Sequence, residues 1–298
     1  MSQIESACGF AAIIGAPNAG KSTLINQLTG SKVSIVSRKV QTTRARIRAI
    51  MLEGATQIVL VDTPGIFAPK RKLDEAMVEA AWGGAGDADA VFFITDARRG
   101  LDEEAEMILA GIEKAGLKPS LILNKIDLLA REKLLDIAKA FNERFAFPAT
   151  FMISALEGGG VKQLREHLAS AMPKGPWLYP EDQIADFPLR QLAAEITREQ
   201  IYDRLHEELP YASTVETETW EERRDGSVRV QQVIYVERDS QKAIVLGKQG
   251  QQIKDLGSRA RAEMERLFEH KVHLFLFVKV RENWTSDPER LRAIGLEP

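Results

Sequence analysis

Three short stretches of this sequence carry residues that could bind and cleave a nucleoside triphosphate. The first, G-A-P-N-A-G-K-S, follows an apolar run and matches G-x-x-x-x-G-K-[ST], whose glycines let backbone amides curl round phosphates. In that pattern Lys21 reaches the β- and γ-phosphates, and the hydroxyl of Ser22 binds magnesium. The predicted phosphate loop consists of Gly15, Ala16, Pro17, Asn18, Ala19, Gly20, Lys21 and Ser22.

The second stretch, N-K-I-D, predicts which base is bound. Asp127 can accept two hydrogen bonds from the N1 and N2 donors of guanine, whereas adenine offers no such pair. A buried carboxylate of this kind can reject the wrong base by about 10⁴-fold or more, because it would be left unpaired. Asn124 and Lys125 are expected to brace the loop and cover the base. A backbone contact to guanine is expected from S-A-L, which comprises Ser154, Ala155 and Leu156.

The third stretch, D-T-P-G, predicts a magnesium site and a switch. Asp62 can hold the ion through a water molecule, and the amide of Gly65 can meet the γ-phosphate. Upstream, a threonine of Q-T-T-R can complete the magnesium shell only while the γ-phosphate is present, so hydrolysis would release this loop. We favour Thr43 over Thr42 as that ligand. The predicted switch I is Gln41, Thr42, Thr43 and Arg44, and the predicted switch II is Asp62, Thr63, Pro64, Gly65 and Ile66.

The elements that position these motifs alternate between short apolar runs and helical patterns, which is typical of βαβ units around a mostly parallel sheet. Strands are expected at 10–14, 58–61, 90–95, 120–123 and 150–154, with a more polar edge strand at 44–52. Helices are expected at about 21–29, 73–83, 102–115, 131–145 and 160–171. Since each motif stands at a strand end, we expect an α/β P-loop GTPase domain over residues 1–172.

A different pattern follows a proline-rich segment. The prolines of M-P-K-G-P-W-L-Y-P cannot continue a helix, so we expect a linker over 173–187. Beyond it the expected elements form an α+β domain over 188–298. They are a helix at 188–208, strands at 214–223 and 228–237 joined by an Asp-Gly turn, two helices around a glycine loop and a strand at 273–280. The first of the two helices is the short segment S-Q-K-A-I-V-L, and the second spans about 251–269.

The glycine pair of G-K-Q-G predicts an RNA-binding turn in this second domain. Such a turn brings backbone amides and a lysine close to successive phosphates, beside an apolar groove for about four unpaired bases. Because the region has only a modest basic excess, we expect base contacts to carry the sequence preference and the salt dependence to be shallow. The candidate RNA-binding residues are Gly247, Lys248, Gln249, Gly250 and Lys254, with Ile244 and Ile253 lining the groove.

Over essentially its whole length the chain resembles the Era-type GTPases of the TrmE-Era-EngA-like superfamily. The residues that carry this resemblance are G-A-P-N-A-G-K-S, Q-T-T-R, D-T-P-G-I, N-K-I-D, S-A-L and V-L-G-K-Q-G-Q-Q-I-K. The resemblance implies a C-terminal type II KH domain and hydrolysis of GTP to GDP and phosphate with Mg²⁺. It also implies binding to the single-stranded 3′ end of 16S rRNA during maturation of the 30S ribosomal subunit. We further expect a cytoplasmic monomer, with peripheral association on the cytoplasmic side of the inner membrane left open.

Ile66 raises a question about hydrolysis, because an apolar side chain cannot orient the attacking water. The resemblance implies a hydrophobic residue where Ras-like proteins use a catalytic glutamine. Several proteins of this kind bind K⁺ through an asparagine of the phosphate loop, and Asn18 occupies the matching place. The hypothesis is that K⁺ stabilises transition-state charge while switch backbone groups position water, which leaves a slow intrinsic rate. The alternative is an asparagine that caps the loop without an ion.

Composition sets outer bounds on these predictions. The chain has 298 residues and a single cysteine, Cys8, so it suits two domains and no intramolecular disulfide. No run approaches the roughly 20 apolar residues of a membrane span, and the histidines show no spacing typical of a transition-metal site. Two other functions stay open. The chain could be an RNA-binding assembly factor with GTP as a structural ligand, or a protein- or membrane-directed signalling GTPase whose second domain binds no nucleic acid.

Overall fold

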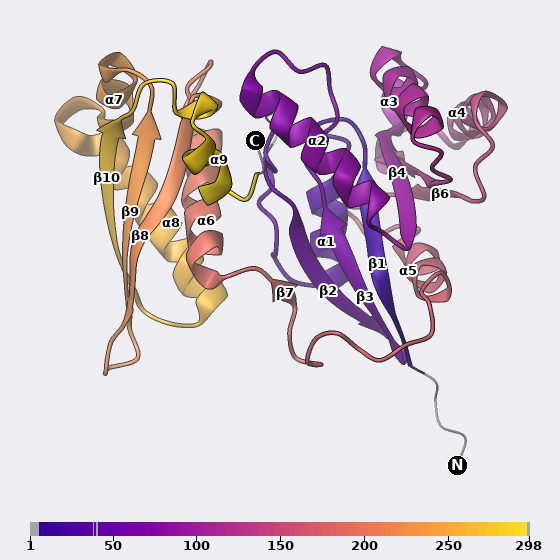
Figure 1. Cartoon of the computed structure of the whole chain (residues 1–298), viewed down its shortest axis with the longest axis horizontal. Coiled ribbons are helices and arrows are strands. Elements are labelled where there is room, and N and C mark those ends of the chain that lie inside the picture. Colours follow the sequence, from indigo (N-terminus) through magenta and orange to yellow (C-terminus); the bar gives the residue numbers. More distant parts are fainter. Residues whose placement is uncertain (1–5, 38, 40, 297–298) are drawn as a thin grey trace. The chain divides into compact units, whose positions relative to one another are not determined.

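The computed structural model describes residues 6–37, 39 and 41–296, so the outermost residues of the expected domains 1–172 and 188–298 lie outside it. The chain divides into two compact units (Figure 1). The first contains the chain up to Ser34, Thr43–Lys70 and Asp74–Asp186. The second contains Ile35–Thr42, Arg71–Leu73 and the chain from Phe187 onward. Two short segments therefore cluster with the second unit although they lie far from it in sequence.

The described part of the first unit is built on one seven-stranded sheet in the order β6-β5-β4-β1-β3-β2-β7. Pairing is parallel from β6 to β3 and antiparallel between β3 and β2 and between β2 and β7. The strands are β1 (Ala7–Ile14), β2 (Ile47–Glu53), β3 (Thr56–Asp62), β4 (Ala90–Asp96), β5 (Ser120–Asn124), β6 (Thr150–Ile153) and β7 (Ala185–Asp186). The mostly parallel sheet expected from the sequence is thus present.

Helices cover both faces of this sheet because its central strands are apolar on both sides. Ile13 and Phe92 belong to a core cluster with residues of α1 and α5, whereas Ile14 and Phe93 pack with α2, α3 and α4. A fully buried side chain of this size stabilises the fold by about 1.5–3 kcal/mol. The helical segments are α1 (Lys21–Thr29), α2 (Lys72–Gly86), η1 (Ala97–Arg99), α3 (Glu103–Lys114), η2 (Ile126–Leu128), α4 (Arg131–Arg144) and α5 (Val161–Ser170).

The expected edge strand at 44–52 is not the edge of the sheet. The segment expected as a linker supplies β7, which pairs with β2, and the Ile50 amide donates to the Ile184 carbonyl at 2.9 Å. Buried Gln57 anchors the same segment, since its Oε1 accepts the amides of Leu178 at 2.8 Å and Tyr179 at 3.0 Å. The prediction was wrong because these hydrogen bonds join residues more than 120 positions apart, which local alternation cannot reveal.

The second unit packs helices against a smaller sheet in the order β10-β9-β8, with β10 parallel and β8 antiparallel to β9. Ala193, Ile201 and Leu256 lie in its core clusters, so α6 and α8 cover one sheet face. Its elements are α6 (Leu189–Arg204), β8 (Ser213–Glu222), β9 (Val228–Val236), α7 (Asp239–Leu246), η3 (Lys248–Gly250), α8 (Gln251–Phe268), β10 (Val272–Val280), η4 (Trp284–Ser286) and α9 (Pro288–Ala293).

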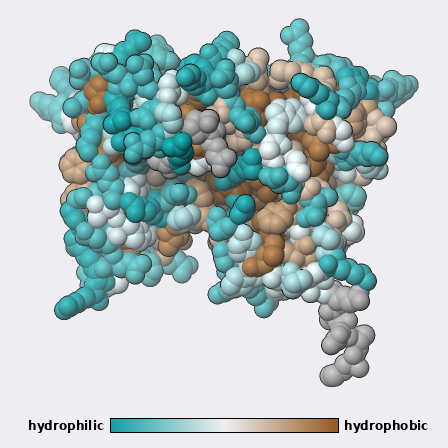
Figure 2. All heavy atoms as spheres, in the orientation of Figure 1, coloured by the Kyte–Doolittle hydropathy of each residue, from teal (hydrophilic) through white to brown (hydrophobic). Residues whose placement is uncertain are grey.

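The C-terminal segment folds back onto the second unit. Trp284 is fully buried, and its Nε1 donates to the Ala212 carbonyl at 2.9 Å. On the face drawn in Figure 2 hydrophilic residues predominate. Among the helices that the structure describes, none is both long enough and apolar enough to cross a membrane.

Candidate functional site

The phosphate loop leads from the end of β1 into α1, and its backbone requires glycine at two positions. A Cβ at Gly15 would lie 2.2 Å from the Ile94 carbonyl oxygen. Gly20 has a φ of +100°, and a Cβ there would lie 2.2 Å from Nδ2 of Asn124. Because Gly20 is also the N-cap of α1, no side chain caps this helix. Its first amides and its dipole can therefore bind an anion.

Lys21 places its ammonium group inside this loop. Nζ donates to the carbonyl oxygens of Gly15 at 3.1 Å and Ala16 at 2.9 Å, and the residue is only 6% exposed. Burial lowers the pKa of Lys21 to about 8, although the carboxylate of Asp62 acts in the opposite direction. A phosphate group bound in the loop would add negative charge beside this buried ammonium and would so favour its protonated form.

The three predicted magnesium ligands lie together. The hydroxyls of Ser22 and Thr43 are 2.9 Å apart, and they donate to Oδ2 of Asp62 at 2.9 and 3.2 Å. Burial raises the pKa of Asp62 against the opposing effects of Lys21 and these hydrogen bonds. Within the described residues, no group of three or more His, Cys, Asp or Glu side chains could hold a metal. The predicted magnesium ligands are thus two hydroxyls and one desolvated carboxylate, and hard oxygen atoms of this kind suit Mg²⁺.

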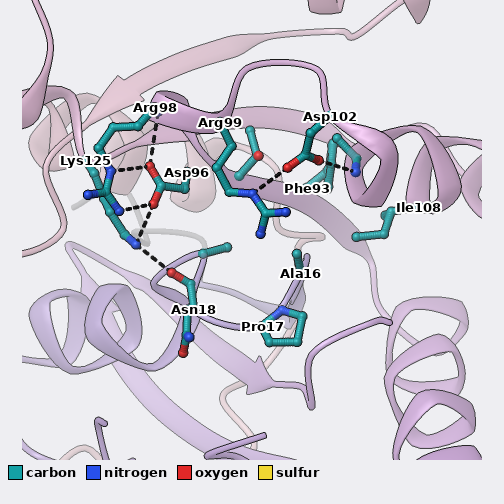
Figure 3. A pocket seen from close by; sticks show the side chains of 13 residues that line it. Ala16, Pro17, Asn18, Phe93, Asp96, Arg98, Arg99, Asp102, Ile108 and Lys125 are labelled. Carbon is teal, nitrogen blue, oxygen red and sulfur yellow. Dashed lines mark hydrogen bonds and ion pairs between the residues drawn. The ribbon is translucent and has the colours of Figure 1, made fainter. Parts of the chain in front are cut away.

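The guanine loop is tied to its neighbours through Asn124 at the end of β5. Nδ2 of Asn124 donates to the Ala19 carbonyl at 2.8 Å, and its Oδ1 accepts the Ala155 amide at 2.9 Å. Lys125 Nζ donates to the Asn18 carbonyl at 2.6 Å (Figure 3). The structure thus joins the phosphate loop, N-K-I-D and S-A-L. Three members of the guanine set differ in exposure: Ser154 is buried, whereas Asp127 and Leu156 are exposed.

The two threonines of switch I differ in what their hydroxyls contact. Thr43 is 6% exposed and points into the cluster with Ser22 and Asp62. The Thr42 hydroxyl instead donates to the Lys39 carbonyl at 2.9 Å. This geometry supports Thr43 as the magnesium ligand. Of the flanking residues, Arg44 is buried, and Gln41 has a left-handed backbone with a φ of +59°.

Switch II packs directly on the phosphate loop. A Cβ at Gly65 would lie 2.8 Å from the backbone nitrogen of Pro17, and the Ile66 amide donates to the Gly15 carbonyl at 3.0 Å. The Ile66 side chain is 2% exposed and belongs to the core cluster that contains Phe93. It therefore faces the protein interior and not a site for water. Thr63 is equally buried, with its hydroxyl donating to the Ile13 carbonyl at 2.7 Å.

In the second unit, the G-K-Q-G turn joins α7 to α8. Gly247, Gln249 and Gly250 have φ values of +70°, +52° and +75°. A Cβ at Gly247 would lie only 2.5 Å from the Cβ of Gln252, so there is no room for a side chain. The positive φ of Gly247 also disfavours any residue other than glycine. The other RNA-binding candidates differ in exposure: Lys248, Gln249, Lys254 and Ile244 are exposed, and Ile253 is half-buried.

Comparisons with known proteins agree with both units. Residues 10–125 match the family model described as 50S ribosome-binding GTPase, and residues 208–285 match the KH domain model. Proteins called GTPase Era from Afipia carboxidovorans and Brucella suis are 65% and 62% identical over 97% and 98% of this chain, and over 94% of their own length. These matches confirm the fold expected from the sequence, a P-loop GTPase domain followed by a KH domain.

Two solved structures resemble nearly the whole chain. One is a crystal structure of Era in complex with MgGDPNP and nucleotides 1506–1542 of 16S ribosomal RNA, 36% identical with a TM-score of 0.93. The other is an Aquifex aeolicus Era variant bound to GDP and AlF₄⁻, 37% identical with a TM-score of 0.92. Each match covers 97% of this chain and 99% of the other.

Proposed function

Because this chain belongs to the Era family of GTPases, we propose that it hydrolyses GTP in its first unit and binds the 3′ end of 16S rRNA through its KH domain, assisting maturation of the 30S subunit. The observation that carries the proposal is the cluster of Ser22, Thr43 and Asp62 beside the buried ammonium of Lys21. Magnesium ligation by Thr43 would require the γ-phosphate, which would make the site a switch and not only a binding pocket.

The residues of the first unit divide the work of GTP hydrolysis. Mg²⁺ held by Ser22, Thr43 and, through water, Asp62 would neutralise charge on the β- and γ-phosphates. Lys21 and the amides at the start of α1 bind the same oxygens. Since Ile66 is buried in the core, main-chain groups of the switches must position the attacking water. A site without a side-chain base fits a slow intrinsic rate.

K⁺ bound at Asn18 is the proposed source of additional transition-state stabilisation. Asn18 lies in the phosphate loop with a φ of +61°, so its side chain projects from a turn and not from a helix. The supporting observation is buried Ile66, an apolar side chain that leaves charge stabilisation to another group. We expect hydrolysis to be at least several-fold faster in K⁺ than in Na⁺ and Asn18→Ala to abolish that difference. Equal rates in the two salts would contradict the K⁺ site.

The KH domain supplies the proposed RNA site. The amides of the G-K-Q-G turn and Lys248 would contact the backbone, while Ile244 and Ile253 would line the groove for unpaired bases. The family model described as 50S ribosome-binding covers only the GTPase unit, so it does not decide which subunit is bound. The Era structure with a 16S rRNA segment favours the small subunit.

Crosslinking in cells tests this proposal. The protein is crosslinked to RNA and the bound nucleotides are mapped, with the Gly247→Asp, Gly250→Asp double variant in parallel. We expect crosslinks at the 3′ end of 16S rRNA that the double variant loses while it still binds GTP. Crosslinks mainly to 23S rRNA would reject the 30S assignment. An absence of RNA crosslinks with intact GTP binding would favour a signalling GTPase with another partner.

Oligomeric state and location are separate parts of the proposal. We propose a monomer in the cytoplasm with peripheral association to the inner membrane. Light scattering during size-exclusion chromatography tests the first part. Flotation with vesicles of anionic phospholipid tests the second, and protein that stays at the bottom of the gradient in every nucleotide state would reject membrane association.

A further inference from the structure

Asp96 pairs with two cations in the pocket drawn in Figure 3. It ends β4 and is 5% exposed. Its carboxylate accepts the Arg98 amide at 3.1 Å and the Arg98 guanidinium at 3.0 and 2.5 Å. The Oδ2 atom, which Arg98 Nη2 also contacts, accepts a hydrogen bond from Lys125 Nζ at 2.8 Å. One carboxylate thus joins an arginine from η1 to the lysine of the guanine loop.

The same lysine ammonium reaches the phosphate loop. Lys125 Nζ donates to the Asn18 carbonyl at 2.6 Å. Lys125 and Asn18 have φ values of +65° and +61°, in the left-handed region that residues other than glycine rarely adopt. Such backbone persists only where surrounding contacts hold it. The hydrogen bond from Lys125 to the Asn18 carbonyl therefore joins two residues with unfavourable backbone conformations. It forms only when the Lys125 ammonium lies against that carbonyl.

A cavity large enough for water adjoins that ammonium. Asp96, Lys125 and Asn18 line a cavity of about 200 Å³, which has room for several water molecules at about 30 Å³ each. A lysine ammonium is flexible and strongly hydrated, so an open cavity alone does not fix it. Burial raises the pKa of Asp96, but hydrogen bonds from Arg98 and Lys125 outweigh this effect and lower the pKa to about 2. The carboxylate is therefore charged at neutral pH.

We propose that Asp96 is a positioning residue for guanine-nucleotide binding, which holds the Lys125 ammonium against the Asn18 carbonyl and so couples the guanine loop to the phosphate loop. Arg98 fixes the carboxylate by a two-point contact and keeps it turned toward Lys125. This inference rests on the assignment of Lys125 to the guanine site. Asp96 itself touches no nucleotide in this proposal, and it acts only through the lysine.

A double-mutant cycle on the full chain tests the proposal, with release of a fluorescent GDP analogue as the readout. Asp96→Asn keeps the size of the side chain and removes its charge. We expect it to speed GDP release about tenfold, the effect of losing one charge-assisted hydrogen bond. In a Lys125→Gln background the same change should have no further effect, because the residue through which Asp96 acts is gone.

Asp102→Asn is the matched control. Asp102 lines the same cavity and caps α3 by accepting the Ala105 amide at 2.9 Å, but the described contacts do not join it to Lys125. The control should leave GDP release unchanged. An undiminished effect of Asp96→Asn in the Lys125→Gln background, or an equal effect of Asp102→Asn, would overturn the proposal.

Two further outcomes separate this proposal from the site assignment. If Lys125→Gln speeds release and Asp96→Asn does not, only the role of Asp96 is rejected. If Lys125→Gln changes nothing, the assignment of Lys125 fails and the role of Asp96 with it. Should Asp96→Asn not fold, Arg98→Gln leaves both partners in place and frees the carboxylate to turn. It should speed release about threefold, and an unchanged rate would reject the proposal.

Discussion

The two switches of this GTPase are held by different parts of the chain. Switch II belongs to the first unit, where main-chain contacts fix it: Gly65 packs on Pro17, and the Ile66 amide binds the Gly15 carbonyl. The segment that leads into switch I, Ile35–Thr42, clusters instead with the second unit. The predicted switch II, residues 62–66, thus lies wholly within the first unit, whereas the residues that lead up to Thr43 cluster with the second unit.

Side chains of α6 hold that segment. Glu199 Oε1 accepts the Val36 amide at 2.9 Å, and the Tyr202 hydroxyl donates to the Gln41 carbonyl at 3.0 Å. Arg198 donates through Nη2 to the Thr42 carbonyl and pairs with Glu195. Thr42, whose carbonyl Arg198 contacts, directly precedes Thr43, the predicted magnesium ligand.

The largest expected effect distinguishes the two threonines of switch I. Thr43→Val should slow GTP hydrolysis by about 10²–10³-fold, because it removes a magnesium ligand that forms only with the γ-phosphate. Thr42→Val is the matched control and should change the rate less than about threefold, since it loses only one exchangeable hydrogen bond to the Lys39 carbonyl. Single-turnover hydrolysis measures both. A larger loss in Thr42→Val would reverse the assignment of the ligand.

A second prediction tests the burial of switch II. Ile66→Gln should not accelerate hydrolysis, because the side chain at this position points into the core. It should lower the free energy of unfolding by about 2–4 kcal/mol, since a buried amide would lack partners. Ile66→Val, the control, should cost about 1 kcal/mol. Urea unfolding and steady-state kinetics measure these effects, and a faster Ile66→Gln enzyme would show that the residue can reach the water.

The third prediction tests whether α6 couples RNA binding to the nucleotide. Arg198→Met should reduce the ratio of RNA affinities with a non-hydrolysable GTP analogue and with GDP, from about tenfold to near one. The reason is that Arg198 is fully buried and contacts the carbonyl just before Thr43. Binding to a single-stranded 16S rRNA 3′-end oligonucleotide, followed by fluorescence anisotropy, measures the ratio.

Arg190→Met on the same helix is the control for Arg198→Met. Arg190 donates to the carbonyls of Thr217 and Glu218, and both of these residues lie in the second unit. It should leave the affinity ratio unchanged. An equal loss in both variants would assign the effect to general destabilisation of α6. A wild-type ratio of one would favour the alternative in which GTP is a structural ligand.

The motifs that predict the nucleotide site lie together in the structure because each is short and stands at a strand end. The phosphate loop, N-K-I-D and D-T-P-G each follow an apolar run, and parallel strands bring their carboxyl ends to one edge. Asp96 also follows such a run and could have been noticed by that criterion. Arg198 could not, because its partner lies 156 residues earlier in the chain. The switch I contacts depend on tertiary packing and leave no local pattern.

The smallest expected effect concerns pH and the anchor of switch II. Lys21 Nζ and the Ile66 amide share the Gly15 carbonyl. Burial holds the pKa of Lys21 at about 8 in the free protein, below its ordinary value of 10.5. In the free protein Lys21 therefore loses its proton as pH rises through about 8. In the complex, the negative charge of the bound phosphate keeps Lys21 protonated. Nucleotide affinity should fall severalfold between pH 7.5 and about 8.5, at most tenfold per unit.

Calorimetry in buffers of different ionisation enthalpy measures the proton that nucleotide binding takes up at about pH 8.5. Lys21→Arg is the control, because an arginine stays charged throughout this range and should abolish both the proton uptake and the pH dependence. If wild-type affinity is flat across this range, Lys21 keeps its proton in the free protein. The Gly15 carbonyl would then accept a hydrogen bond from a Lys21 ammonium that stays charged throughout this range. The contact of the Ile66 amide with the same carbonyl would not change with pH.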